Sequence, residues 1–252
     1  MRTANAEFPV RKGAFQPMTE RQTVIRDNLL RVFEKMAEAE KRRGSEGKVT
    51  LLGATKTVSA EDVVFAGELG LRVAGENRVQ EFTDKFDAVS AAVDEYHFIG
   101  HLQTNKVKYL VGRCPLIHSA SSMHLIAEID RLAEKRAVTQ DVLLEVNCAG
   151  EDTKSGFSPE AVAEAVAEAE SFKSIRVRGL MTMGPAGAEK EVLRKFFRET
   201  YSIFIDIFEK KPHNIREYIL SMGMSDSYEL AIEEGATLVR VGSAIFGNRL
   251  YT

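Results

Sequence analysis

Two short turns in the last quarter of the chain combine residue types that bind anions. The first turn, S-M-G-M-S, runs from Ser221 to Ser225, and the second consists of Gly242 and Ser243. Each precedes a run that predicts a short helix, and Ser225 is the expected N-cap of the first. Backbone N–H groups at helix N-termini hold phosphate. Either turn alone is more often ordinary capping, but two turns on either side of Arg240 favour a ligand that carries phosphate.

A lysine at the end of an apolar run adds a candidate nucleophile. Lys56 follows V-T-L-L-G-A-T, residues 49–55, which predicts a buried strand. Beside another cation such as Arg240, a lysine shifts toward the neutral amine, which attacks aldehydes. A solvated lysine is the commoner case at such a position. Its chemistry therefore depends on what the rest of the chain places around it.

Length and composition describe an ordinary globular protein. The chain has 252 residues, of which 44% are hydrophobic and 28% are charged. Its net charge of −3 gives no electrostatic support for binding nucleic acid, and no apolar run is as long as a membrane span. Cys114 and Cys148 fit a reducing compartment, and the histidines show no metal-ligand spacing. We expect a cytoplasmic protein without a metal, nucleic-acid or membrane partner.

Strands and helices alternate eight times along the chain. Helical patterns lie between the strands, and an extra helix over 19–43 precedes the first one. Continuous apolar runs indicate strands that are buried on both faces, hence a parallel sheet. The chain therefore fits an α/β fold with one (β/α)8 TIM barrel, and a doubly wound open sheet is the alternative. The predicted strands cover 49–55, 71–74, 96–99, 116–119, 141–147, 175–181, 217–220 and 238–241.

A barrel would gather the candidate residues in one mouth. We expect residues 1–18 to form a loose leader and residues 19–252 to form the single barrel domain. Functional residues of such barrels lie at the carboxyl ends of the strands, and phosphate binds after strands seven and eight. Lys56 follows the first strand, and both turns follow the last two. A reactive lysine beside a phosphate site suggests pyridoxal phosphate (PLP), held as a Schiff base and by its phosphate.

Seven motifs, in the same order, resemble the YggS/PROSC-type PLP homeostasis proteins, the YggS-like family. They cover the chain from about residue 49 to its end, and together they are highly specific. They are A-T-K-T (54–57), G-E-N-R-V-Q-E (75–81), H-F-I-G-H-L-Q-T-N-K (97–106), K-S-G-F (154–157), R-G-L-M-T-M (178–183), L-S-M-G-M-S-D (220–226) and V-R-V-G-S-A-I-F-G (239–247).

The resemblance implies a barrel like the alanine racemase N-terminal domain, with PLP bound covalently at Lys56. It places Arg240 near the pyridine nitrogen, where an arginine disfavours a protonated ring and weakens the cofactor as an electron sink. Many members have G-P-L-Q where this chain has G-H-L-Q, so His101 is a departure near the mouth. The cofactor-binding residues carried over are Lys56, Asn77, Ser221, Met222, Ser225, Arg240, Gly242 and Ser243.

The resemblance further implies a role in intracellular PLP (vitamin B6) homeostasis without catalytic turnover. Such a protein holds PLP, with PLP-dependent enzymes as candidate recipients, and we expect a monomer. A PLP-dependent amino-acid racemase is the alternative, as a main or a side activity. A two-base racemase needs a second acid or base opposite the lysine, which alanine racemases take from a separate β-domain across a dimer. The sequence shows no such domain after the last predicted helix, which favours the carrier.

Overall fold

Eight parallel strands close into a barrel in the order β1 to β8, with β8 paired to β1. The computed structural model describes residues 17–44, 47–148, 155–185, 187–209 and 218–247. The prediction of a (β/α)8 barrel is confirmed. The strands are β1 (Thr50–Ala54), β2 (Val73–Glu76), β3 (Glu95–Phe98), β4 (Leu116–Ala120), β5 (Gln140–Val146), β6 (Ile175–Thr182), β7 (Ile219–Ser221) and β8 (Leu238–Val241).

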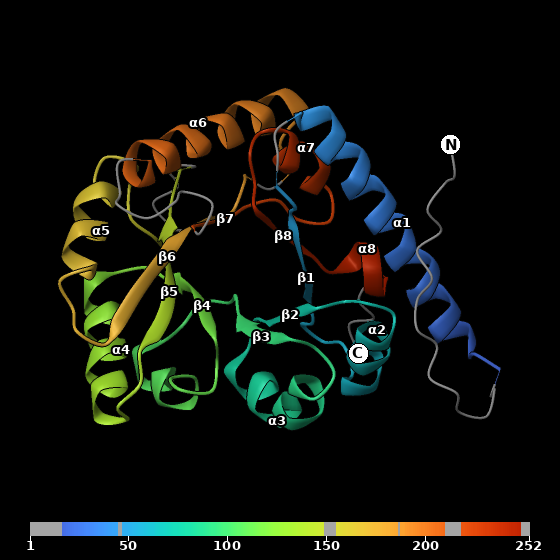
Figure 1. Ribbon diagram of the computed structural model, residues 1–252, viewed down its shortest axis with the longest axis horizontal. Coiled ribbons are helices and arrows are strands. Elements are labelled where there is room, and N and C mark those ends of the chain that lie inside the picture. The colour runs from blue at the N-terminus through green and yellow to red at the C-terminus, as the bar shows by residue number, and fades with distance from the viewer. Residues whose placement is uncertain (1–16, 45–46, 149–154, 186, 210–217, 248–252) are drawn as a thin grey trace.

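The helices form an outer ring around the strands (Figure 1). Their apolar faces pack on the outside of the barrel and make most of the core, as the 3.6-residue periodicity predicts. They are α1 (Glu20–Arg43), α2 (Ala60–Glu68), α3 (Val79–Ser90), the 3-10 helix η1 (Thr104–Tyr109), α4 (Met123–Lys135), α5 (Val162–Ala169), α6 (Lys190–Phe208), α7 (Tyr228–Glu233) and α8 (Ser243–Phe246).

The extra N-terminal helix is present as predicted, and it packs against α7, α8 and α2. It begins with a capping box, in which Thr19 and Gln22 satisfy each other's backbone N–H groups. It ends at Gly44, which is in the left-handed conformation at φ 70°. Of the predicted leader, residues 1–16 lie outside the described residues, so the division at residue 18 stays a prediction.

The predicted strand ends differ from the observed ones by at most two residues. The second strand, expected over 71–74, runs from Val73 to Glu76, so the first residues of the G-E-N-R-V-Q-E motif belong to the strand. The seventh, expected over 217–220, is Ile219–Ser221, and residue 217 lies outside the described residues. Apolar patterning does not mark these ends because hydrogen-bonded neighbours decide where pairing stops.

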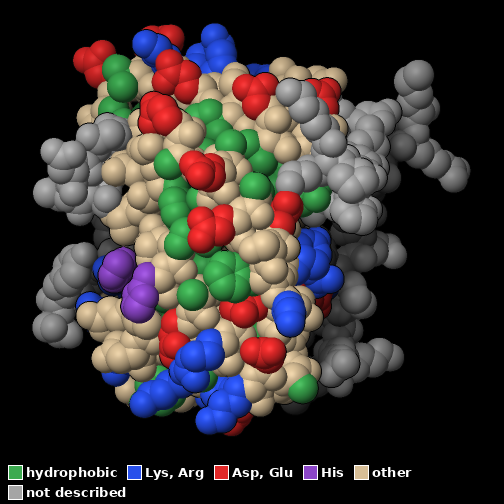
Figure 2. Space-filling view, turned by 90° about the vertical axis from the view of Figure 1, so that its left-hand side faces the viewer, with side chains coloured by type: hydrophobic (Ala, Val, Ile, Leu, Met, Phe, Trp, Pro, Cys, Tyr) green, Lys and Arg blue, Asp and Glu red, His purple; other side chains and the backbone are tan. Residues whose placement is uncertain are grey.

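The outer surface carries charges of both signs. Figure 2 shows acidic side chains along the whole of one face, with lysines and arginines at its upper edge, on its right-hand side and toward its lower end. This mixture agrees with the small net charge of the chain, −3. None of the described helices is long and apolar enough to span a membrane.

One glycine is required where β6 bends against its neighbours. The β5–β6 pairing shifts between Val142 and Leu143, which pair with Val177 and Gly179, so Arg178 is an extra residue in β6. Gly179 has φ +139°, and a Cβ there would lie 2.0 Å from the carbonyl oxygen of Ile219. Because that oxygen belongs to the backbone of β7, a side chain cannot be accommodated by a rotamer change.

We expect Gly179→Ala to lower the free energy of unfolding by about 3 kcal/mol or more, measured by urea denaturation. The control is Gly44→Ala, which has the same kind of positive φ but nothing within 4 Å of the added Cβ. It should cost about 1 kcal/mol, from the left-handed backbone alone. Equal losses in the two variants would contradict the steric explanation.

Candidate functional site

A cavity of about 340 Å³ opens at the carboxyl ends of β1 and β8. Its lining includes Lys56, which follows β1, together with Gly242 and Ser243, which follow β8. The two strand ends lie side by side because β1 and β8 are hydrogen-bonded neighbours. The structure therefore brings the predicted lysine and the predicted second turn to one place.

Two backbone N–H groups converge on a single oxygen beside this cavity. The hydroxyl of Ser225 accepts hydrogen bonds from the N–H of Gly242 at 3.0 Å and from that of Ala244 at 3.3 Å. A Cβ on Gly242 would lie 3.1 Å from the carbonyl oxygen of Ala54, so glycine allows the close approach of the turn to β1. Paired N–H groups around one oxygen are the arrangement that fits a phosphate oxygen.

The predicted N-cap role of Ser225 is wrong. Helix α7 begins at Tyr228, after a turn in which the N–H of Met224 donates to the hydroxyl of Ser227 at 3.2 Å. The Ser225 side chain is thus left to bond the amides at the start of α8. The two turns form one polar cluster rather than two separate helix caps.

Helix α1 donates hydrogen bonds to helix α8, which follows the Gly242 turn. The sequence did not predict these contacts. Arg21 donates to the carbonyl oxygen of Phe246 at 2.6 Å, and Asn28 donates to that of Ile245 at 3.1 Å. These carbonyls end the four-residue helix α8. The two partners of the Arg21 contact are 225 positions apart in the sequence, and those of the Asn28 contact are 217 positions apart. Local sequence patterns do not connect residues at such separations.

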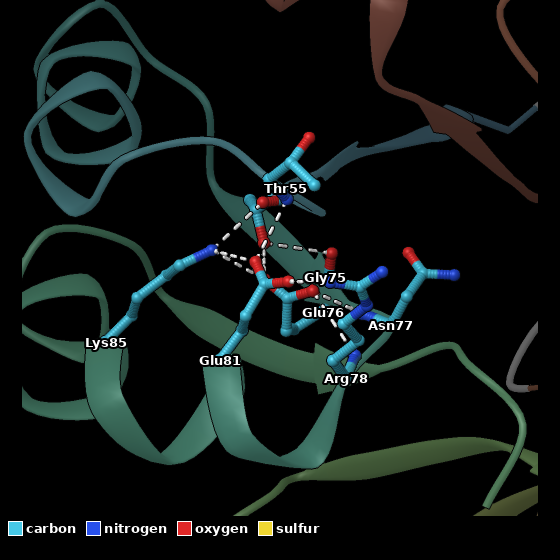
Figure 3. A network of polar contacts seen from close by, with 8 residues as sticks. Thr55, Gly75, Glu76, Asn77, Arg78, Glu81 and Lys85 are labelled. Carbon is cyan, nitrogen blue, oxygen red and sulfur yellow. Dashed lines mark hydrogen bonds and ion pairs between the residues drawn. The ribbon is translucent and has the colours of Figure 1, made fainter. Parts of the chain in front are cut away.

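A buried network fixes the loop that carries Lys56 (Figure 3). Its centre is the fully buried Glu76, which accepts from the Thr55 hydroxyl at 3.0 Å and from the Lys85 ammonium at 3.0 Å. The other carboxylate oxygen accepts from the backbone N–H of Asn77 at 2.7 Å and of Arg78 at 3.3 Å. A buried carboxylate needs such partners, because an unpaired charge in the interior is costly.

The same network holds both chain neighbours of Lys56. Lys85 donates to the Thr55 carbonyl oxygen at 3.2 Å, and Glu81 accepts from the Thr57 N–H at 2.9 Å. Thr57 has φ +63°, a strained conformation for a β-branched residue. The G-E-N-R-V-Q-E motif thus supplies Glu76 and Glu81, which position the lysine loop rather than the ligand.

Arg240 lies inside the barrel as part of β8, with 5% of its surface exposed. It donates to the Ser221 hydroxyl at 2.6 Å and to the Thr182 carbonyl oxygen at 2.8 Å. Burial lowers the pKa of Arg240 to about 10, while Glu145 opposes that shift. The guanidinium is therefore still charged at neutral pH, two residues before the Gly242 turn.

The remaining predicted residues lie at the same end of the strands. Met222 is fully buried directly after β7, and its N–H donates to the carbonyl oxygen of Leu238. Asn77 follows β2 and is half-buried, and its side chain points away from the carboxylate network in Figure 3. His101 is exposed. Lys154, in the K-S-G-F motif, lies outside the described residues.

Glu145 is a buried acid near Arg240 for which the sequence left two interpretations open, a paired core charge or a group facing the barrel. It is 4% exposed, and the Ser155 hydroxyl donates to it at 3.3 Å. Burial raises the pKa of Glu145 to about 7, while Ser155 and Arg240 oppose the shift. Within the described residues, no group of three or more His, Cys, Asp and Glu side chains could hold a metal ion.

We expect Lys85→Met to lower the free energy of unfolding by about 3 to 5 kcal/mol, because it leaves the buried Glu76 carboxylate without its ammonium partner. Adding Glu76→Gln should recover a large part of the loss. Lys195→Met is the control, since its ion pair with Glu199 is exposed, and it should change stability by less than about 0.5 kcal/mol. Losses that simply add in the double variant would refute the pairing.

We expect Glu145→Gln to stabilise the protein at pH 8 but not at pH 5. The pKa of Glu145 is raised from 4.5 to about 7 in the folded state, so its contribution to stability is lost as pH rises through that range. The gain at pH 8 should reach at most about 3 kcal/mol, measured by urea denaturation. Glu168→Gln on the exposed face of α5 is the control. The same difference at both pH values would show that titration is not the cause.

Known proteins match the chain over nearly its whole length. Residues 42–249 match the family model for the alanine racemase N-terminal domain. The pyridoxal phosphate homeostasis protein of Aquifex aeolicus is 44% identical over 226 residues, which are 89% of this chain and 98% of that protein.

Two solved structures share the fold and the order of the elements. An unknown protein from Bifidobacterium adolescentis has a TM-score of 0.83 at 36% identity, over 92% of this chain and 98% of that chain. PipY of Synechococcus elongatus, solved with PLP bound, has a TM-score of 0.75 at 27% identity, over 88% of this chain and 100% of that chain. The chain thus belongs to the alanine racemase N-terminal domain family and, within it, to the pyridoxal phosphate homeostasis proteins.

Proposed function

We propose that the protein binds PLP in the mouth of the barrel and serves in intracellular PLP homeostasis. The observation that carries the proposal is the cavity in which Lys56 lies with Gly242 and Ser243, beside two amides that converge on one oxygen. An amine and a phosphate cradle are the two groups that PLP requires of a protein. Family membership supports the same ligand, because PipY was solved with PLP bound.

Each end of the ligand has a chemical partner in this site. The Lys56 amine forms a C=N bond to the aldehyde carbon, and the aldehyde oxygen leaves as water. A phosphate oxygen would replace the Ser225 hydroxyl as the acceptor for the amides of Gly242 and Ala244, and the hydroxyls of Ser225 and Ser243 would then donate to the phosphate. We place the ring toward Arg240, with Asn77, Ser221 and Met222 as its further neighbours; the cavity that contains Lys56 is lined by none of these four residues.

The charge on Arg240 favours holding PLP over turning over substrates. PLP catalyses reactions at amino acids by accepting electrons into its ring, which a protonated pyridine nitrogen promotes. A guanidinium keeps its own protons at neutral pH and donates hydrogen bonds instead. A ring that faces Arg240 therefore stays unprotonated and is a weak electron sink.

The cavity lining also favours a carrier over a racemase. A two-base racemase needs a second acid or base opposite the lysine. Among the described residues that line the cavity, the titratable ones are Arg21, Lys56 and Asp62. Asp62 is ion-paired with Arg21 at 2.8 Å, on the side of the cavity that faces α1.

A carrier of this kind protects the cell from a reactive aldehyde and keeps the cofactor available. We place the protein in the cytoplasm, where Cys114 and Cys148 stay as the free thiols of the structure. Residues 19–252 act as one domain and as a monomer. The recipients of the cofactor are apoenzymes that depend on PLP, which compete for the aldehyde with a lysine of their own.

We expect Lys56→Ala to abolish the covalent adduct that borohydride reduction fixes after incubation with PLP, because the amine is gone. The measurement is the intact mass and the labelled peptide. Lys173→Ala, at an exposed lysine, is the control and should keep the adduct on Lys56. A full yield of adduct on another lysine in Lys56→Ala would refute the assignment. Rapid interconversion of alanine enantiomers by the loaded wild type would instead support the racemase.

A further inference from the structure

A chain of polar side chains crosses the interior of the barrel. The interior of an eight-stranded barrel is normally filled by branched apolar side chains. Here His97 of β3, His118 of β4, Ser221 of β7 and Arg240 of β8 are all buried, each at most 5% exposed. Strands β4 and β8 are four places apart in the ring, so this row of polar side chains joins opposite walls of the barrel (Figure 1).

The side chains touch one another in a single file. Glu95, at the start of β3, is 2.5 Å from Nε2 of His97, and Nδ1 of His97 is 3.0 Å from Nε2 of His118. Nδ1 of His118 is 3.1 Å from the Ser221 hydroxyl, to which Arg240 donates at 2.6 Å. The Glu95 side chain is 54% exposed, so the file connects solvent with Arg240.

Donor and acceptor chemistry gives this file one direction. A guanidinium only donates, so Ser221 accepts from Arg240, and we assign the Ser221 O–H as the donor to Nδ1 of His118. That nitrogen is then the acceptor, and the proton of His118 is on Nε2. His118 therefore donates to Nδ1 of His97, whose proton is on Nε2 and points to the Glu95 carboxylate. Every donor meets an acceptor, with both imidazoles neutral.

The charges along the file agree with this assignment. The pKa of His118 is lowered well below its ordinary value, first by burial and then by His97 and Arg240. The hydrogen bond between Glu95 and His97 lowers the pKa of Glu95, so the Glu95 end of the file is a carboxylate. The assignment requires a neutral His118 inside the barrel and an ionised Glu95 at the start of β3.

We propose that Glu95, His97, His118 and Ser221 form a positioning relay that orients the Arg240 guanidinium toward the ring nitrogen of bound PLP. The inference rests on the proposed function for its ligand. The relay commits the Ser221 hydroxyl to His118, away from the mouth. Arg240 uses one N–H on Ser221 and one on the Thr182 carbonyl oxygen, and the fixed planar group presents its other N–H groups to the ligand.

The relay explains why four polar groups are kept where apolar packing would serve the fold. Buried polar groups cost free energy unless each one is satisfied, and replacing a buried polar set by apolar residues is often neutral for stability. A single fixed orientation of Arg240 is what the set adds. If His118 is lost, the Ser221 hydroxyl is free to rotate toward the ligand and to compete with the guanidinium for the ring nitrogen.

The first test uses the protein without PLP. Long-range proton–nitrogen NMR spectra of protein with ¹⁵N-labelled histidine report the tautomer of each ring. We expect His97 and His118 to be neutral at pH 7.5, each with its proton on Nε2. An Nδ1-protonated tautomer of either ring, or a charged His118, would overturn the relay whether or not the protein binds PLP.

The second test reads the ligand itself. PLP labelled with ¹⁵N in the ring is bound to the wild type, to His118→Phe and to His97→Phe, and the chemical shift of the ring nitrogen is recorded. We expect both variants to keep the adduct on Lys56 but to shift the ring-nitrogen resonance. The matched control is His124→Phe on the surface, which should leave the resonance in place. His97→Phe removes the partner of His118, leaves the Ser221 hydroxyl in place, and serves if His118→Phe fails to fold.

The outcomes separate the relay from the proposed function. A ring-nitrogen resonance that is unchanged in both relay variants would overturn the positioning role, even with the expected tautomers. A wild type that takes up no PLP would instead refute the proposed function, and the tautomers would then decide the relay by themselves. Expected tautomers together with a shifted resonance in the relay variants alone would establish it.

Discussion

The pairing of β1 with β8 is the constraint on which the site depends. It closes the barrel, and it sets the end of the first strand beside the end of the last one. Lys56 and Gly242 are far apart in the chain but line one cavity for this reason. An open sheet with the same elements would leave β1 and β8 apart, and the amine and the phosphate cradle would not serve one ligand. Closure is thus a chemical requirement here as well as a way of removing sheet edges.

Hydrogen bonds from charged and polar side chains hold both halves of this mouth. On the β1 side, Glu76 gathers two backbone amides, a hydroxyl and an ammonium, which fixes the chain on either side of Lys56. On the β8 side, α1 holds the last carbonyls of α8 through Arg21 and Asn28. A covalent carrier of the kind we propose would gain from such fixed positions, because the Lys56 amine and the proposed phosphate cradle would be in place before the ligand arrives.

The sequence predicts the barrel well because burial on both faces leaves continuous apolar runs, which eight strands repeat. It also places Lys56 and the Gly242 turn at the mouth, since the predicted ends of the first and last strands fall within one residue of the observed ones. It predicts Ser225 wrongly as a helix cap, because a hydroxyl before an apolar run has the same signature whichever amide it bonds. The links of Arg21 to α8, and of His97 through His118 to Ser221, lie beyond sequence reasoning, since they join side chains that only closure of the barrel brings together.

The interior file of hydrogen bonds bears on how a racemase-like fold becomes a carrier. A carrier must form the bond to PLP readily yet avoid activating the ring toward amino acids. A charged, oriented guanidinium meets the second need, because it gives the ring nitrogen a hydrogen bond without a proton. Burial lowers the pKa of Arg240 only to about 10, so its charge survives at neutral pH. In the proposed relay, the neutral His118 gives the Ser221 hydroxyl an acceptor away from the mouth, and the barrel interior would thereby restrain the chemistry at its opening.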